Sequence, residues 1–315
     1  MNDDIKYIYN VLITAIFLLF LNMATGNSES RILLPSSTAI FNKYDNHIYI
    51  SNSFFKRSIF SKYGIFQLDE DAGTIVPIFT TFWDIDDFLI DENLIIYEEW
   101  DTPMSVNICS FNIETNRKNR ILSNVYSLEA IYNHVIYYVN DRTLYQYEMI
   151  TKRKQELFHF SVLSSYKNGF LYTISEASKD YEYYYDIPTN SHNRAFVPID
   201  YSSYFIGPFG VQKYNGTVFN VEGEIIADLS NPSVQNYILT DKYIFYYDSS
   251  KEKIVIHRLP SLEVAAEINV SYEHFYSFIC DDKLFVIQKN NRSTIDLINI
   301  QSCDAKIITT PWYSR

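Results

Sequence analysis

Residues 130–140 of the 315-residue chain read AIYNHVIYYVN, an apolar strand pattern, an Asn-containing turn and an aromatic-rich strand pattern. Two such patterns around a short polar turn are typical of a β-hairpin. The phrase recurs, as AIFNKYDNHIYIS from residue 39, FLIDENLIIYE from 88, SYKNGFLYTIS from 165, ILTDKYIFYYD from 238 and FICDDKLFVIQ from 278. The chain is therefore predicted to be a series of hairpins.

Two more strand patterns complete each unit. An apolar–polar–apolar alternation that ends in a turn occurs in seven copies, at residues 66–68, 111–113, 147–149, 185–187, 219–221, 257–259 and 298–300. A last apolar strand closes the unit, as at 74–79, 224–229, 264–270 and 306–310. The average spacing of roughly 39 residues is typical of four-stranded propeller blades.

A lone four-stranded blade cannot bury both of its faces, so such units stack around an axis. We therefore expect an all-β fold, a seven-bladed β-propeller of four-stranded antiparallel blades, over residues 38–315. The fifth unit has Gly-Pro-Phe-Gly at 207–210 in place of an Asn or Asp turn. Residues 121–131 also fit a helical period, which leaves one helix as an alternative there.

The repeat, with Tyr-Tyr-Asp at residues 184–186 and again at 246–248, resembles the broad superfamily of WD-repeat, YVTN and YWTD-like propellers. The resemblance covers nearly the whole chain after residue 38. The Gly-His pair of WD repeats and the double glycine of kelch repeats are missing, and Trp-Asp occurs only at residues 83–84 and 100–101, both in the second unit. The resemblance therefore implies a fold and assigns no functional residue.

The composition agrees with a β-rich domain and narrows the class of partner. Hydrophobic residues make up 47% of the chain and aromatic residues 17%, which favours strands. With 8 Gly and 9 Pro, many turns must come from Asn and Asp. The net charge of −12 disfavours nucleic acid and anionic lipid as partners. Cys109, Cys280 and Cys303 have no metal-type spacing, and we expect them to be small buried hydrophobic residues.

An apolar run at the amino terminus, VLITAIFLLFL at residues 11–21, is followed by Ala24, Thr25 and Gly26. Small residues after such a run are typical of a signal peptide. Because Asp3 and Asp4 precede the run, an uncleaved membrane anchor is an alternative, and a buried helix is a third. We expect a hydrophobic helix as leader over residues 1–26, a linker over 27–37, and a propeller outside the cytosol, secreted or anchored by this segment alone.

Long loops of the first two units predict a binding face. The segment 52–63 contains Phe54, Phe55 and Phe60, Trp83 opens the second unit, and Trp100 lies in a segment, 98–104, that we expect to be a loop. Clustered aromatic side chains are typical of protein interfaces and sugar-stacking platforms. Folding back onto their own blades is the alternative.

Residues that begin the innermost strands would surround the central funnel. They are Asp84, Tyr126, Tyr201, Tyr237, Glu273 and His274. Three glycosylation sequons start at Asn215, Asn269 and Asn291, all in the last three units. Glu273 and His274 are a carboxylate–imidazole pair, but strand neighbours point to opposite faces, which weakens an acid–base hypothesis.

The sequence thus predicts a monomeric propeller that binds a protein or a glycan and needs no cofactor or metal. A hydrolase or lyase acting in the funnel is one alternative, and a structural surface domain is the other. Fold alone cannot decide among them. The residues predict no catalytic site, so whether the chain is an enzyme stays open, with binding favoured.

Overall fold

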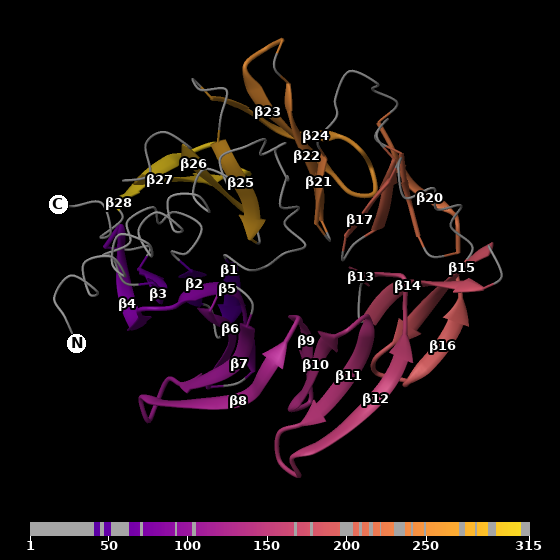
Figure 1. Ribbon diagram of the computed structural model, residues 1–315. Helices are drawn as coiled ribbons and strands as arrows, with labels where there is room; N and C mark the ends of the chain where they lie inside the picture. Colours follow the sequence, from indigo (N-terminus) through magenta and orange to yellow (C-terminus); the bar gives the residue numbers. More distant parts are fainter. Residues whose placement is uncertain are drawn as a thin grey trace, which may run out of the picture. The chain divides into compact units, whose positions relative to one another are not determined.

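The hairpin phrases fold as antiparallel strand pairs, and each pair continues into a four-stranded sheet. The computed structural model describes residues 41–309 except 45–46, 52–62, 70–71, 92, 103–104, 167–168, 177–178, 196–203, 208–209, 214–216, 221, 230–236, 241, 249, 271–274, 281 and 289–293. These residues belong to one compact unit, Leu34–Arg315. Figure 1 labels strands of each sheet along the chain.

The strands of the first four sheets follow chain order. Sheet 1 contains β1 (Phe41–Tyr44), β2 (His47–Ser51), β3 (Tyr63–Asp69) and β4 (Thr74–Thr81). Sheet 2 contains β5 (Asp84–Asp91), β6 (Leu94–Thr102), β7 (Ser105–Asn112) and β8 (Arg117–Val125). Sheet 3 contains β9 (Ser127–Tyr132), β10 (Val135–Asn140), β11 (Thr143–Glu148) and β12 (Arg153–His159). Sheet 4 contains β13 (Val162–Tyr166), β14 (Gly169–Glu176), β15 (Lys179–Asp186) and β16 (Ser191–Arg194).

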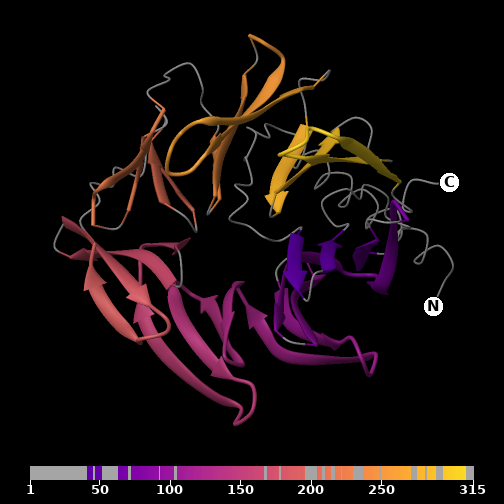
Figure 2. The same ribbon diagram turned by 180° about the vertical axis from the view of Figure 1, so that it is seen from behind.

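The last three sheets have the same order. Sheet 5 contains β17 (Tyr204–Gly207), β18 (Gly210–Lys213), β19 (Thr217–Phe219) and β20 (Ile225–Asp228). Sheet 6 contains β21 (Tyr237–Leu239), β22 (Tyr243–Asp248), β23 (Lys253–Arg258) and β24 (Val264–Asn269). Sheet 7 contains β25 (Phe275–Cys280), β26 (Lys283–Gln288), β27 (Thr294–Asn299) and β28 (Ala305–Thr309). The view from behind in Figure 2 shows the same strands in chain colours.

Asn and Asp supply several of the turns, as the composition predicts. The turn between β9 and β10 has Asn133 and His134 at φ 50° and 61°, and the next turn has Asp141 and Arg142 at φ 48° and 56°. Two consecutive residues with positive φ form the tight turn whose twist matches that of antiparallel strands. The Asn turn of the AIYNHVIYYVN phrase therefore sets the register of β9 with β10, in which Tyr132 pairs with Val135.

Hydrophobic side chains fill the spaces between consecutive sheets. One buried cluster joins sheets 1 and 2, and others join sheets 2 and 3, 3 and 4, 5 and 6, and 6 and 7. Strand β13 contacts β17, which connects sheets 4 and 5, and the last strand, β28, contacts β4 of sheet 1. Each sheet therefore packs on its neighbours along the chain, and the all-β propeller of small antiparallel sheets is confirmed.

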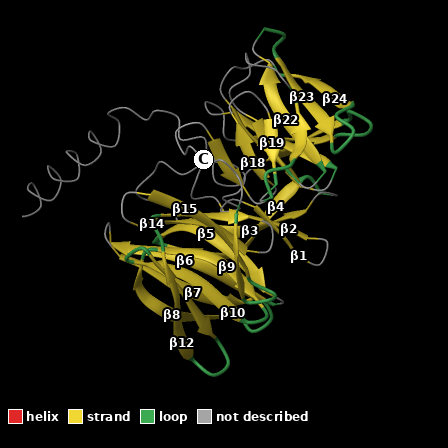
Figure 3. Ribbon diagram, turned by 90° about the vertical axis from the view of Figure 1, so that its right-hand side faces the viewer, coloured by secondary structure: helices red, strands yellow, loops and turns green. Residues whose placement is uncertain are grey.

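Two expectations about helices have different outcomes. The helix considered at residues 121–131 is wrong, because these residues form the end of β8 and most of β9. The exposed Tyr126 separates the two strands, and Asn124, at φ 56°, is the next-to-last residue of β8. In the described part of the chain, Figure 3 shows strands and loops and no helix. The leader helix at residues 1–26 and the linker at 27–37 lie outside the described residues.

Candidate interaction surface

Three aromatic side chains are exposed where the chain crosses from one sheet to the next. Phe82 and Trp83 connect β4 to β5 and are 76% and 47% exposed, and Tyr126 connects β8 to β9 and is 74% exposed. We call them the loop aromatics. Strands β5 and β9 contact each other, and each begins directly after these residues. The loop aromatics therefore lie at one end of two neighbouring strands, which we call the crossing end.

Two carboxylates next to this end are buried. Glu98 and Glu99 are 4% and 2% exposed, although the sequence places them in a loop. That expectation is wrong, because β6 continues to Thr102 and pairs with both β5 and β7. Successive strand residues point to opposite faces of a sheet. Glu98 and Glu99 therefore face sheets 3 and 1, respectively, in agreement with their contacts.

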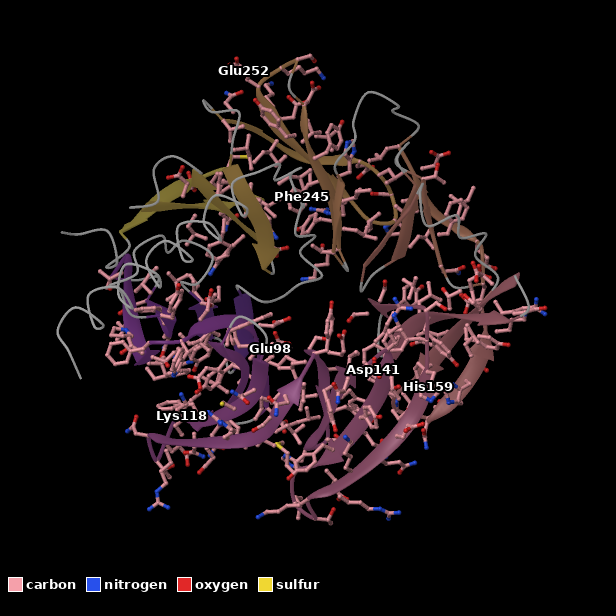
Figure 4. All side chains as sticks on the ribbon, viewed as in Figure 1. Glu98, Lys118, Asp141, His159, Phe245 and Glu252 are labelled. Carbon is pink, nitrogen blue, oxygen red and sulfur yellow. The ribbon has the colours of Figure 1, made fainter. Side chains whose placement is uncertain are left out.

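Glu99 connects three strands of two sheets. Its Oε1 accepts hydrogen bonds from Thr81 Oγ1 of β4 at 2.9 Å and from Lys118 Nζ of β8 at 2.5 Å. Its Oε2 accepts a weak one from Cys109 Sγ at 3.6 Å. Burial raises the pKa of the Cys109 thiol to about 11, with a further rise from Glu99 and an opposing effect of Lys118. Figure 4 labels Lys118 and Glu98 on the violet strands of sheet 2.

Two buried polar groups lie beside Glu99, on Tyr97 and Asn107. Tyr97 and Asn107 lie on the same face of sheet 2, since Tyr97 pairs with Cys109 and Glu99 with Asn107. Among the described residues, neither Tyr97 Oη nor Asn107 Nδ2 has a hydrogen bond of normal geometry. Burial, with smaller effects of Cys109 and Glu99, raises the pKa of Tyr97. A buried polar atom without a partner destabilises the fold by about 1–3 kcal/mol.

Glu98 makes the corresponding contact on the other side of sheet 2. Its Oε1 accepts a hydrogen bond from the backbone amide of Leu128 in β9. The ladder between β9 and β10 shifts register so that Tyr137 pairs with Ala130 and Tyr138 with Leu128. This β-bulge re-aims the backbone at the start of β9, as bulges do near strand ends.

Trp100 packs inward in the structure. It is half-buried, lies in β6 and contacts the hydrophobic cluster between sheets 2 and 3. Trp83, by contrast, remains at the surface, and its neighbour Phe82, which sequence reasoning did not select, is the more exposed of the two. Its position in the connection that follows the β4 strand pattern could have indicated that Phe82 is exposed.

The other sequence-predicted residues are placed only in part. Asp84 is exposed as the first residue of β5, and Tyr237 is the first residue of β21. Asn269, the acceptor of one sequon, is exposed at the end of β24. The remaining predictions fall outside the described residues: Phe54, Phe55, Phe60, Tyr201, Glu273, His274, Asn215 and Asn291. The funnel enzyme hypothesis, which names Glu273, His274 and Asp84, stays untested, because two of these three residues lie outside the described residues.

The cysteines differ in their surroundings. Cys109 is a buried free thiol, as expected, whereas Cys303 is exposed and the expectation of burial is wrong for it. Cys303 lies in the turn between β27 and β28 at φ 59°, where its amide bonds to the Asn299 carbonyl at 2.8 Å. Turn geometry therefore decides its exposure. The side chain of Cys280 lies outside the described set.

Two features are absent from the described residues. Between residues 41 and 309, leaving out the gaps, no three His, Cys, Asp or Glu side chains gather as ligands for a metal ion. In the same part of the chain, no helix has the length and apolar character required to cross a membrane.

Comparisons with known proteins give a fold relationship. No protein-family model and no curated protein matches the chain. Oligopeptidase B from Leishmania major is similar in structure at a TM-score of 0.52 and 9% identity, over 86% of this chain and 48% of the other. A chain of the mitotic checkpoint complex (TM-score 0.48, 10% identity, 89% and 92% covered) and Hsv2 from Kluyvelomyces marxianus (0.47, 10%, 84% and 93%) also match. At 9% identity, the similarity to oligopeptidase B shows a shared fold alone, and the chain is a β-propeller on the basis of its own sheets.

Proposed function

We propose that the chain is a binding propeller that works outside the cytosol and contacts a protein partner through the loop aromatics. The proposal includes a closed ring of seven blades. It is supported by the seven four-stranded sheets and by the contact of β28 in the last sheet with β4 in the first. A closed ring leaves its two ends as the surfaces open to partners.

The exposure of the loop aromatics is the observation that carries the proposal. Large aromatic side chains bind at small entropic cost, and tyrosine and tryptophan are enriched among the residues that dominate interface energies. Two adjacent aromatic residues and a third in the neighbouring loop would form one apolar area at the crossing end. A glycan is the alternative partner, because aromatic faces also stack on sugar rings.

The location outside the cytosol is supported by the amino-terminal apolar run and by an accessible sequon. Residues 11–21 are apolar apart from Thr14. The Asn269 side chain is exposed at the end of the outermost strand of sheet 6, where a glycan would not disturb the core. Glycosylation occurs on Asn-X-Ser/Thr sites of secreted proteins.

Alanine variants of the loop aromatics test the proposal. The exported protein is used to capture a partner from the medium and surface of cells that express it, and the affinity of the purified pair is then measured. Trp83→Ala and Tyr126→Ala should each weaken binding about tenfold or more, which corresponds to ~1.4 kcal/mol or more at an interface centre. Ile150→Ala is the matched control, because Ile150 is 74% exposed in the turn after β11.

The outcomes separate the candidates. Equal affinity of Trp83→Ala, Tyr126→Ala and Ile150→Ala would remove the loop aromatics from the binding surface. Binding to a glycan array that is lost in Trp83→Ala, with no captured protein, would replace the protein partner by a sugar.

A further inference from the structure

Glu98 and Glu99 are consecutive buried carboxylates whose contacts reach the flanks of both crossing loops. Sheet cores seldom hold an ionised carboxylate, because removing the charge from water is costly and a well-packed apolar side chain often stabilises the fold as well or better. Two consecutive buried carboxylates on β6 therefore indicate a role other than filling the core. Their partners, on β4 and β9, indicate that role.

Glu99 acts on the first loop through a hydroxyl relay. Thr81 is the last residue of β4, and its Oγ1 donates to Glu99 Oε1 at 2.9 Å. The same Oγ1 accepts a hydrogen bond from the backbone amide of Trp83 at 3.3 Å. Because a hydroxyl has a single proton to donate, the carboxylate fixes its direction and leaves a lone pair for the Trp83 amide. Glu99 thereby holds the backbone that carries Phe82 and Trp83.

Glu98 acts on the second loop directly. Its carboxylate accepts from the amide of Leu128, two residues after Tyr126. The amide of Tyr126 itself bonds to the Val139 carbonyl at 2.9 Å. The segment that presents Tyr126 is therefore held at two neighbouring points, one of which is Glu98.

The Glu99 carboxylate has a positively charged partner. Lys118 of β8 bonds to Glu99, and its side chain is 42% exposed while that of Glu99 is 3% exposed. Lys118 also lies 5.7 Å from the centre of the Tyr97 ring. The ion pair keeps the Glu99 carboxylate in place for Thr81, since hydrogen bonds to a charged acceptor are stronger than neutral ones.

We propose that Glu98 and Glu99 are positioning residues for the interaction surface, Glu99 fixing Phe82 and Trp83 and Glu98 fixing Tyr126. The functional meaning of this device rests on the binding function proposed above. The positioning itself can be measured without a partner. Its failure and the failure of the binding proposal are therefore distinguishable.

Two single-tryptophan reporters test the proposal. The chain has 3 Trp, at positions 83, 100 and 312, so Trp100→Phe with Trp312→Phe leaves Trp83 as the reporter of the first loop. Adding Trp83→Phe and Tyr126→Trp moves the reporter to the second loop. Acrylamide quenching and fluorescence anisotropy of each reporter are measured in Glu98→Ala and Glu99→Ala.

The expected result is reciprocal. Glu99→Ala should lower the anisotropy and raise the quenching of the reporter at 83 and leave the reporter at 126 unchanged. Glu98→Ala should lower the anisotropy and raise the quenching of the reporter at 126 and leave the reporter at 83 unchanged. Glu99→Gln should restore the reporter at 83, because the amide oxygen still accepts from Thr81. Thr81→Val, which breaks the relay and leaves the carboxylate in place, should reproduce Glu99→Ala and serves where that variant fails to fold.

A control separates positioning from general loosening. A 2.9 Å hydrogen bond between His134 Nδ1 and Asp91 Oδ2 also joins sheets 2 and 3, at the opposite end. His134→Ala should lower the unfolding midpoint and leave both reporters unchanged. A reporter at 83 that is unaffected by Glu99→Ala and Thr81→Val, or equal responses of both reporters to either carboxylate variant, would overturn the proposal.

Discussion

Two buried tyrosines should respond in opposite directions to the removal of one oxygen atom. Tyr97 and Tyr243 are 0% and 3% exposed, and each lies in the second strand of its sheet. Tyr243 Oη donates to Asp282 Oδ1 at 2.6 Å, and this bond joins sheet 6 to sheet 7. Tyr97 Oη has no such partner among the described residues. The substitution to phenylalanine is the same at both positions, so the partner decides the effect.

The magnitudes follow from the hydrogen bonds. Tyr243→Phe loses a bond to a charged acceptor and should destabilise the fold by about 1.5–3 kcal/mol. Tyr97→Phe removes a buried hydroxyl that makes no hydrogen bond of normal geometry to a described residue, and it should be neutral or stabilise the fold by about 1 kcal/mol. At roughly 2 °C per kcal/mol for a domain of this size, the melting temperature should fall by about 3–6 °C in one variant and hold or rise by about 2 °C in the other.

Thermal and urea unfolding, followed by circular dichroism, measure both variants against the wild type. The Phe79 ring packs at a tilt against the Tyr97 ring with ring centres 5.0 Å apart, and phenylalanine at position 97 can keep this contact. A loss in Tyr97→Phe as large as that in Tyr243→Phe would refute the reasoning, because the Tyr97 hydroxyl would then have a partner in solution.

Three further predictions concern single groups. In a Cys280→Ser background, maleimide should label the exposed Cys303 in the folded protein and the buried Cys109 only after unfolding, and fast labelling of Cys109 would contradict its burial. Burial lowers the pKa of His192 from its ordinary 6.5, so the unfolded chain binds the proton more readily and stability should fall as the pH drops below about 6.5. His192→Gln should flatten that fall in melting temperature between pH 7 and pH 5, and an identical profile would exclude His192 as its source. When the protein is expressed in a secretory pathway that glycosylates, glycosidase treatment should lower its mass. The loss should exceed that of Asn269→Gln by the mass of one glycan, and equal losses would show that Asn269 is unmodified.

The strand pattern could be predicted because its causes are local. In residues 130–140 the period-two alternation and the Asn turn agree, and β9 and β10 form where the pattern places them. The helix alternative at 121–131 arose because a short apolar run fits two periods equally well. These residues form strands because β8 pairs with β7 and β9 pairs with β10, and residues 121–131 alone do not reveal either pairing.

The buried carboxylates could not be predicted, because what stabilises them is remote in sequence. Glu98 and Glu99 read as a solvated loop beside Trp100. Their partners Thr81, Lys118 and Leu128 lie 18, 19 and 30 residues away. Only the packing of sheet 2 between two neighbours brings these groups together, so the burial of the two carboxylates follows from this packing and not from the local residues.

Photo-cross-linking at single positions tests the binding surface most directly. A benzophenone amino acid replaces Phe82 at the crossing end or Ile150, which is equally exposed, in cells that export the chain. The account predicts a discrete protein adduct from position 82, lost in Trp83→Ala, and none from position 150. Adducts from 150 alone, equal adducts from both positions, or none from 82 would contradict it.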